Sequence, residues 1–145
     1  MNKGERARID AKLKLGDKFN REISKLVRFA DTKFSNNIEI DRLKRLIKIG
    51  KDTDPVLLIE ECSINFTKFS EYINNENEDF FLQYEFEEEI NDMNEEDHSF
   101  LNNIVKLFKS KFCEFSKAEK KEIWKLLKMM LEDVEQYEKI NLKAS

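Results

Sequence analysis

The scarcity of turn-forming residues is the feature that most constrains how this chain can fold. Only three glycines and one proline occur in 145 residues, so the sequence offers few places for tight hairpins. Apolar residues instead recur every three to four positions, the period of a helix with one buried face. The sequence therefore predicts an all-α fold, a single-domain helical bundle over residues 1–145 with about five to six helices and a long C-terminal one.

Glycine and aspartate mark the expected ends of the first two helices. The first helix is expected at about 17–32, because Asp17 can cap it directly after Gly16. Residues 1–16 could extend it as a basic N-terminal arm, although Gly16 leaves that continuity open. A short second helix follows, and Gly50 is expected to end it in a left-handed conformation.

The middle of the chain carries a strong helix-start signal. Asp54 can accept backbone N–H bonds and Pro55 suits the first helical position, so a third helix is expected from there to about residue 74. A short helix is expected at about 79–84. Residues 85–98 are expected to form an acidic mobile connection.

Two helices are expected in the last third of the chain. Apolar residues recur with helical spacing over about 100–113. Ser116 and Glu119 have the spacing of a capping box, in which each side chain satisfies the backbone donor of the other. The last helix is therefore expected to begin there and to run to about residue 140.

Charge divides the chain into three blocks. Residues 1–51 hold 15 Lys or Arg against 7 Asp or Glu, residues 52–99 hold 1 against 16, and residues 100–145 hold 10 against 7. One interpretation is a solvated surface on which the basic and acidic blocks face one another. The other is that a basic N-terminal face binds an acidic partner, while the stretch from Glu85 to Asp97 engages a basic partner or repels nucleic acid.

Two groups of side chains are the candidate partner-binding residues. The basic group lies in the N-terminal arm and consists of Arg6, Arg8, Lys12 and Lys14. The aromatic group consists of Phe80, Phe81, Tyr84 and Phe86. Core packing is the alternative role for the aromatic group. Nucleic-acid binding through residues 1–51 is the alternative role for the basic block, because phosphate contacts need only clustered cations.

The sequence shows no recognisable catalytic or cofactor-binding constellation. His98 is the only histidine, and its single Glu-x-x-His spacing with Glu95 falls short of a metal site. Cys62 and Cys113 are far apart and are expected to be buried free thiols. We therefore expect a non-enzymatic protein with no cofactor and no bound metal.

No segment has the apolar length of a signal peptide or a membrane span. The expected setting is therefore intracellular and cytoplasmic, without membrane contact. This expectation agrees with the two cysteines, which show no pairing pattern.

Four segments resemble a pattern in small uncharacterised helical proteins of nucleocytoplasmic large DNA viruses. They are a Pro-led helix, a Tyr-x-x-x-Ile-like turn, an Asp-Phe-Phe element and an Ile-Trp-x-x-Leu helix, at Asp54–Ile59, Phe69–Asn74, Glu78–Leu82 and Lys121–Leu127. The match covers about residues 54–140 and leaves the basic N-terminal part unmatched. The resemblance implies a viral origin, a virion or host-cytoplasm setting, and no enzymatic role.

The expected function is protein–protein interaction by a helical module. On the viral resemblance, it would be a minor virion or assembly component that binds itself or other virion proteins. The alternative is a nucleic-acid-associated accessory protein that uses residues 1–51.

Overall fold

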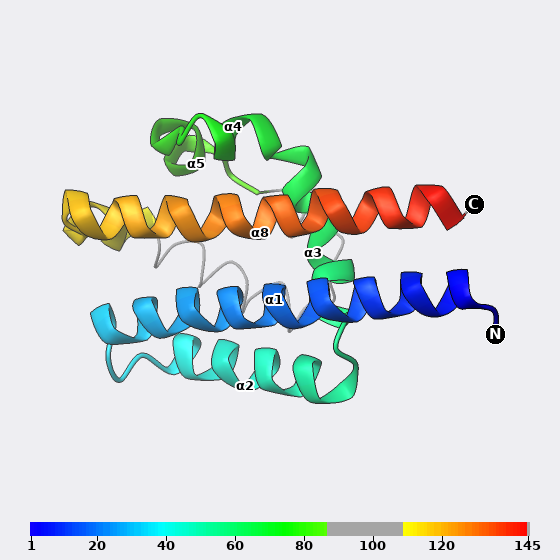
Figure 1. Ribbon diagram of the computed structural model, residues 1–145. Coiled ribbons are helices and arrows are strands. Elements are labelled where there is room, and N and C mark those ends of the chain that lie inside the picture. The colour runs from blue at the N-terminus through cyan, green and yellow to red at the C-terminus, as the bar shows by residue number, and fades with distance from the viewer. Residues whose placement is uncertain (87–108, 145) are drawn as a thin grey trace.

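The computed structural model describes residues 1–86 and 109–144, and every element in these ranges is helical (Figure 1). The elements are α1 (Lys3–Lys33), α2 (Ile38–Thr53), α3 (Leu57–Lys68), α4 (Ser70–Asn74), α5 (Glu78–Gln83), the 3-10 turn η1 (Phe112–Glu114) and α8 (Lys117–Ala144). The all-α prediction is confirmed, including the long C-terminal helix.

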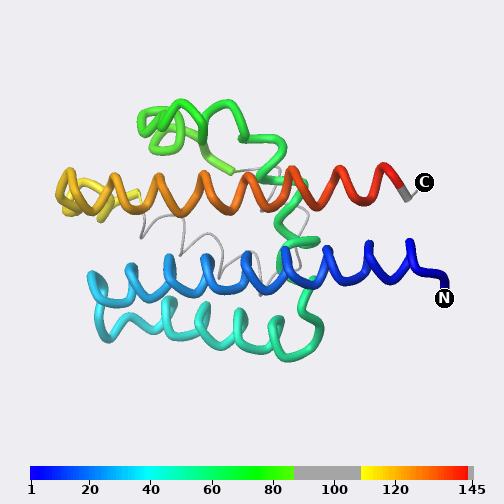
Figure 2. The backbone as a smooth tube through the Cα atoms, viewed as in Figure 1, coloured from blue at the N-terminus to red at the C-terminus, as the bar shows by residue number. Residues whose placement is uncertain are grey.

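The two longest helices form the centre of the arrangement. α1 and α8 run antiparallel beside each other, with both chain termini at the same end (Figures 1 and 2). α2 packs on α1, while α4 and α5 lie on the other side of α8. α3 crosses α1 and α8 and connects these two sides, so the bundle is layered as α2, α1, α8 and the α4–α5 pair.

The core lies along the seam between α1 and α8. At its middle, α3 adds a third wall, and the buried residues of this cluster are Phe19, Ile59, Met130, Val134 and Tyr137. Toward the α1–α2 turn a second cluster contains Ala30, Phe34, Ile40, Phe115 and Ile123. The helical periods identified in the sequence therefore face a common interior.

Gly16 does not interrupt the first helix, which runs unbroken from Lys3 to Lys33. Asp17 is therefore not a cap; the side chain of Asn2 accepts the hydrogen bond of the first turn, from the Glu5 N–H at 2.8 Å. A Cβ at position 16 would lie 2.5 Å from the Pro55 carbonyl oxygen. Glycine is required there because the α2–α3 connection approaches α1 closely. The sequence pattern suggested a possible helix break at Gly16 and gave no sign of this contact.

Gly50 likewise lies inside a helix, because α2 continues to Thr53. The expectation that it ends the helix in a left-handed conformation was wrong: no described glycine has a positive φ. A Cβ at position 50 would lie 2.8 Å from Leu58, so the missing side chain makes room for α3.

The third helix begins two residues later and ends earlier than predicted. Asp54 Oδ1 accepts a 3.0 Å hydrogen bond from the Val56 N–H. This hydrogen bond closes a turn before α3, which begins at Leu57, and does not cap the first turn of the helix. The helical path then breaks at Phe69, between α3 and α4. The short helix expected at about 79–84 is confirmed as α5, capped by Asn77, whose Oδ1 accepts from the Phe80 N–H at 3.0 Å.

The capping box at the start of α8 is confirmed. Ser116 Oγ accepts from the Glu119 N–H at 3.1 Å, and Glu119 Oε1 accepts from the Ser116 N–H at 2.8 Å. The hydrogen bond from the Ser116 backbone, followed by the one from Lys33, holds the pKa of Glu119 below its usual value. α8 extends to Ala144, four residues beyond the predicted end.

Several predictions fall largely on residues 87–108 and so lie outside the described residues. These are most of the acidic connection at 85–98, most of the helix at about 100–113, and the Glu95 and His98 pair.

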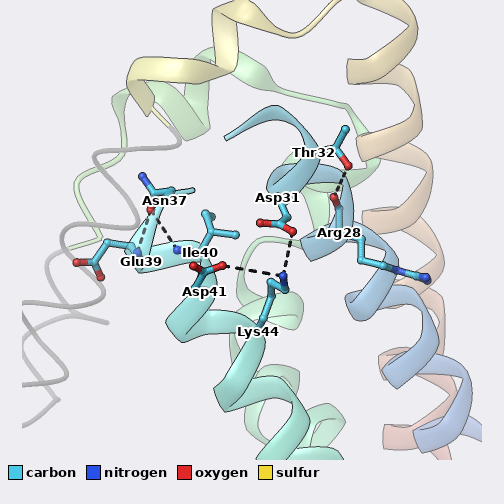
Figure 3. A network of polar contacts seen from close by, with 8 residues as sticks. All are labelled: Arg28, Asp31, Thr32, Asn37, Glu39, Ile40, Asp41 and Lys44. Atoms are coloured by element: carbon cyan, nitrogen blue, oxygen red, sulfur yellow. Dashed lines mark hydrogen bonds and ion pairs between the residues drawn. The ribbon is translucent and has the colours of Figure 1, made fainter. Parts of the chain in front are cut away.

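The junction of α1 and α2 is held by polar contacts (Figure 3). Asn37 Oδ1 caps α2 by accepting from the Glu39 and Ile40 N–H groups at 2.9 and 3.1 Å. Lys44 Nζ donates to Asp31 Oδ2 at 2.9 Å, and that hydrogen bond raises the pKa of Lys44. The Lys44–Asp31 contact joins α2 to α1, and the Asn37 cap fixes where α2 begins.

The packing at Gly16 predicts opposite effects for two similar substitutions. Gly16→Ala should lower the free energy of unfolding by about 1 to 3 kcal/mol, because the new Cβ meets a backbone oxygen that cannot turn away. Gly4→Ala, on the same helix, meets only the Asn2 side chain at 3.4 Å and should raise it by about 0.5 to 1 kcal/mol. Urea unfolding monitored by circular dichroism measures both. Equal effects would contradict the close approach.

Candidate interaction surfaces and a buried acidic pair

The basic candidates Arg6, Arg8, Lys12 and Lys14 all lie on the N-terminal part of α1, whose first residues are exposed. A helix places residues three, four and seven apart on one face. Arg8 and Lys12 therefore share a face, whereas Arg6 and Lys14 project from other sides of the helix. The structure thus divides the four predicted cations into one pair that lies together and two that do not.

The face of Arg8 and Lys12 continues the core-facing stripe of α1. Phe19 and Gly16 lie on the buried face of α1. Toward the N-terminus, the next residues on the same face are Lys12, Ile9 and Arg8. Here the stripe leaves the interior: Ile9 is 42% exposed, and Lys12 Nζ lies 5.4 Å from the centre of the Tyr137 ring of α8. This end of α1 keeps the spacing of a buried face, although most of its side chains are exposed.

A hollow of about 190 Å³ lies on this face, lined by Glu5, Arg8, Ile9 and Lys12. We call these four residues the docking face. It combines two cations, one acid and one exposed aliphatic side chain. A patch of this composition can take up an apolar side chain and pair with carboxylates around it.

A second hollow lies between α1 and α2. It has a volume of about 340 Å³, and its lining residues are Ser24, Val27, Arg28, Lys44, Ile47, Lys48, Lys51 and Asp52. Part of its charge is already engaged, since Lys44 pairs with Asp31 and Lys51 Nζ donates to Ser24 Oγ at 3.3 Å. Figure 3 shows the Arg28 side chain extending away from the Lys44 network. Four basic residues and one acidic residue line this α1–α2 groove, so it is more basic than the hollow on the docking face.

The four aromatic candidates lie together around one buried ring. Phe80, Phe81, Tyr84 and Phe86 place their ring centres 5.3 to 6.1 Å from that of Phe69, which is 6% exposed. All four are half-buried. The tilted and edge-to-face geometries are those that aromatic rings favour in a core. These side chains therefore attach α4 and α5 to the body of the protein, as the core-packing alternative expected.

The acidic block meets α8 through the contacts that the described residues make. Glu76 pairs with Lys128 at 2.5 Å and Glu78 pairs with Lys120 at 2.8 Å. α4 and α5 lie on the far side of the α1–α8 pair from α2 (Figure 1). This part of the acidic block therefore does not neutralise the α1–α2 surface.

A cluster of two buried carboxyl groups and one half-exposed lysine joins α1 to α8, and the sequence did not predict it. Glu22 and Asp133 are 3% and 1% exposed. Lys18 Nζ lies 2.7 Å from Glu22 Oε2 and 2.7 Å from Asp133 Oδ1. One ammonium group therefore serves two buried carboxyl groups.

Burial raises the pKa of Asp133 to about 7, and its hydrogen bond with Glu22 acts in the same direction. The Lys18 ammonium opposes these effects without outweighing them. The pKa of Lys18 is raised although burial opposes it, because the hydrogen bonds to Asp133 and Glu22 favour its charged form. The sequence contained one usable signal: Glu22 lies three residues after Phe19 and four before Leu26, within the apolar stripe of α1.

The two cysteines differ in environment. Cys62 packs against the central core cluster, and burial, assisted by the nearby Glu61 charge, raises the pKa of its thiol to about 11. A nucleophilic cysteine needs the opposite shift. Cys113 is exposed, so the expectation that both thiols are buried was wrong for Cys113.

Residues 1–86 and 109–144 contain no group of three or more His, Cys, Asp or Glu side chains that could hold a metal ion. Within the same ranges, no helix combines the length and apolar character that crossing a bilayer requires. Comparisons with protein-family models, curated proteins and solved structures gave no match.

The cysteine environments predict unequal alkylation. With iodoacetamide at pH 8, Cys113 should react at least about tenfold faster than Cys62, because only the thiolate is reactive and burial suppresses the thiolate of Cys62. Mass spectrometry of the digested protein measures both rates. In denaturant the two rates should converge. Faster labelling of Cys62 in the folded protein would contradict its placement.

Proposed function

We propose that the protein is a non-enzymatic helical interaction module whose docking face binds an acidic, amphipathic helix of a protein partner. The observation that carries this proposal is the composition of Glu5, Arg8, Ile9 and Lys12. They continue the core-facing stripe of α1 toward the N-terminus, where Glu5, Arg8 and Ile9 are exposed and Lys12 is half-buried. On the viral resemblance, the partner would be another virion or assembly protein or a second copy.

The charge around the docking face favours an acidic partner over a second copy. Residues 1–14 hold five Lys or Arg against two Asp or Glu. Two such ends brought together would repel each other, whereas carboxylates on a partner helix would pair with Arg8 and Lys12. Acidic helices are also compatible with the preference of arginine for bidentate carboxylate contacts.

Exposed aliphatic side chains favour a protein over nucleic acid at this face. Ile9 is 42% exposed, Leu13 is 37% exposed, and Leu142 on the adjacent end of α8 is 74% exposed. Phosphate contacts would leave these side chains in water, whereas an amphipathic helix would bury them. A helix that binds in this way inserts apolar side chains spaced three to four residues apart, and its charged residues lie on either side of them.

The α1–α2 groove supports the alternative function, nucleic-acid association through residues 1–51. Arg28, Lys44, Lys48 and Lys51 line it, and such clustered cations suit a phosphate backbone. Asp52 at its edge and the pairing of Lys44 with Asp31 reduce its net positive charge. We therefore rank this alternative second.

A matched pair of double charge reversals tests the docking face. The probe is a synthetic amphipathic helical peptide rich in Glu and Leu. Its binding to the full chain is monitored by two-dimensional NMR. Peptide binding should shift the amide signals of residues 5–13. Arg8→Glu with Lys12→Glu should weaken it about tenfold or more, a change of about 1.4 kcal/mol. The control variant, Arg6→Glu with Lys14→Glu, changes the net charge by the same amount but should weaken peptide binding less than about threefold.

Three outcomes would contradict the proposal. They are no peptide binding, signal shifts confined to other surfaces, or equal losses in the two double variants. Equal losses would show a long-range effect of charge without a defined face.

A duplex DNA arm of the same experiment tests the alternative. At 0.15 M salt we expect no detectable binding, because Asp52 and the pairing of Lys44 with Asp31 reduce the net positive charge of the groove, and salt screens the remaining charge over a Debye length of about 8 Å. Dissociation constants of about 10⁻⁴ to 10⁻⁶ M, falling log-linearly with salt, would support nucleic-acid association instead. In that case, reversing Arg6, Arg8, Lys12 and Lys14 together should flatten the salt dependence.

A further inference from the structure

We propose that Glu22 and Asp133 form a proton-operated latch between α1 and α8: the pair shares one proton when α1 is seated, and losing it loosens the N-terminal half of α1. The latch would regulate the docking face, which lies on that half. This regulatory role rests on the proposed function, whereas the latch itself does not.

The geometry of the carboxyl groups leaves a place for one proton. Lys18 Nζ occupies one oxygen of each group, at 2.7 Å from Glu22 Oε2 and from Asp133 Oδ1. The second oxygens, Glu22 Oε1 and Asp133 Oδ2, are buried and accept no hydrogen bond from any described donor. Buried carboxylate oxygens are seldom left without a donor. A proton on Asp133, hydrogen-bonded to Glu22, supplies the missing donor.

The charge balance supports the same conclusion. Two ionised carboxylates and one ammonium leave a net charge of −1, and both carboxyl groups are almost fully buried while the Lys18 side chain is 42% exposed. One added proton makes the cluster neutral. Uncompensated buried charge is strongly unfavourable, and two carboxylates that share a site separate their titrations. The raised pKa of Asp133, to about 7, agrees with this arrangement.

The other polar groups around the cluster do not replace the proton. Among the described residues, the charged groups that act on Asp133 are Lys18 and Glu22 of α1. One turn along α8, the Tyr137 hydroxyl donates to Glu60 of α3 and is thereby engaged. Lys12 lies over the Tyr137 ring, 5.4 Å from its centre. The pair therefore depends on Lys18 and on the shared proton.

The position of the cluster connects it to the docking face. Lys18 follows Lys12 by six residues, about 9 Å along the helix. Toward the N-terminus, Leu15 packs on the central core cluster and Lys12 lies over the Tyr137 ring. Weakening the cluster therefore removes one of the contacts that hold the end of α1 carrying Glu5, Arg8 and Ile9 on α8.

The direction of the pH effect follows from the raised pKa of Asp133. When α1 is released, Asp133 meets water and its pKa returns toward 3.8. The seated state then binds one more proton than the released state between about pH 4 and pH 7, so seating is favoured at low pH and is lost as pH rises through about 7. Above pH 8 both states are ionised and the dependence levels off.

Carboxyl ¹³C NMR and hydrogen exchange of the full chain test the latch without any partner. Asp133 should titrate near pH 7 in the wild-type protein. The exchange of amides in residues 5–17, corrected for intrinsic rates, should rise about tenfold from pH 6 to pH 8, the change expected over this interval for one linked proton with a pKa of about 7 in the seated state. Asp133→Asn should remove this rise, because an amide keeps the shape and supplies the donor at every pH. Glu135→Gln, at an exposed position on α8, should leave it unchanged.

Titration of Asp133 near pH 4 would overturn the latch, and so would pH-independent exchange of residues 5–17. The wild-type titration needs no variant, so poor folding of Asp133→Asn would not obscure the result. The acidic peptide adds the regulatory test: its affinity for the wild-type chain should fall from pH 6 to pH 8, and its affinity for Asp133→Asn should stay constant. A latch that titrates while peptide affinity stays constant would overturn regulation alone, and absence of peptide binding at any pH would contradict the docking proposal alone.

Discussion

The seam between α1 and α8 is the interaction on which the rest of the structure depends. These helices have 31 and 28 residues, and each of the other long elements packs on one of them or crosses both. Helices gain most of their stability from packing an apolar face. α2 and the α4–α5 pair lie on opposite sides of the seam (Figure 2) and do not stabilise each other directly. A change in the α1–α8 contact therefore reaches both sides of the bundle.

The second constraint is the close approach of the α2–α3 connection to α1. Pro55 reaches α1 at Gly16, and Asn20 Nδ2 donates to the Pro55 carbonyl at 3.0 Å. This contact determines where α3 begins to cross the seam, and so where Ile59 enters the core. The single proline of the chain and one of its three glycines thus meet at one point.

Local physical chemistry made the helices and their caps predictable, whereas contacts between distant residues were not. The Ser116 and Glu119 box depends only on spacing within one turn, and α5 follows from a cap and an apolar pair. Gly16 and Gly50 were interpreted as helix ends because a glycine favours such places when no neighbour is known. Their actual partners, Pro55 and Leu58, are 39 and 8 residues away. The docking face was predicted in part, since Arg8 and Lys12 share it, but Arg6 and Lys14 do not.

Glu22 and Asp133 show the same limit in the chemistry of charged groups. In sequence they belong to the charged residues that make up 39% of the chain, and only the place of Glu22 within the apolar stripe of α1 sets it apart from solvated acids. Their distinguishing property is burial, which arises only when these two residues, 111 positions apart in the sequence, meet. Burial turns an ordinary carboxylate into a group that must find a cation or a proton, and Lys18 supplies only one cation for two carboxylates. The charged residues of α1 therefore have two separate roles in our proposals: at its exposed N-terminal end they would select a partner, and inside the seam a deficit of one positive charge would make the packing of α1 depend on pH.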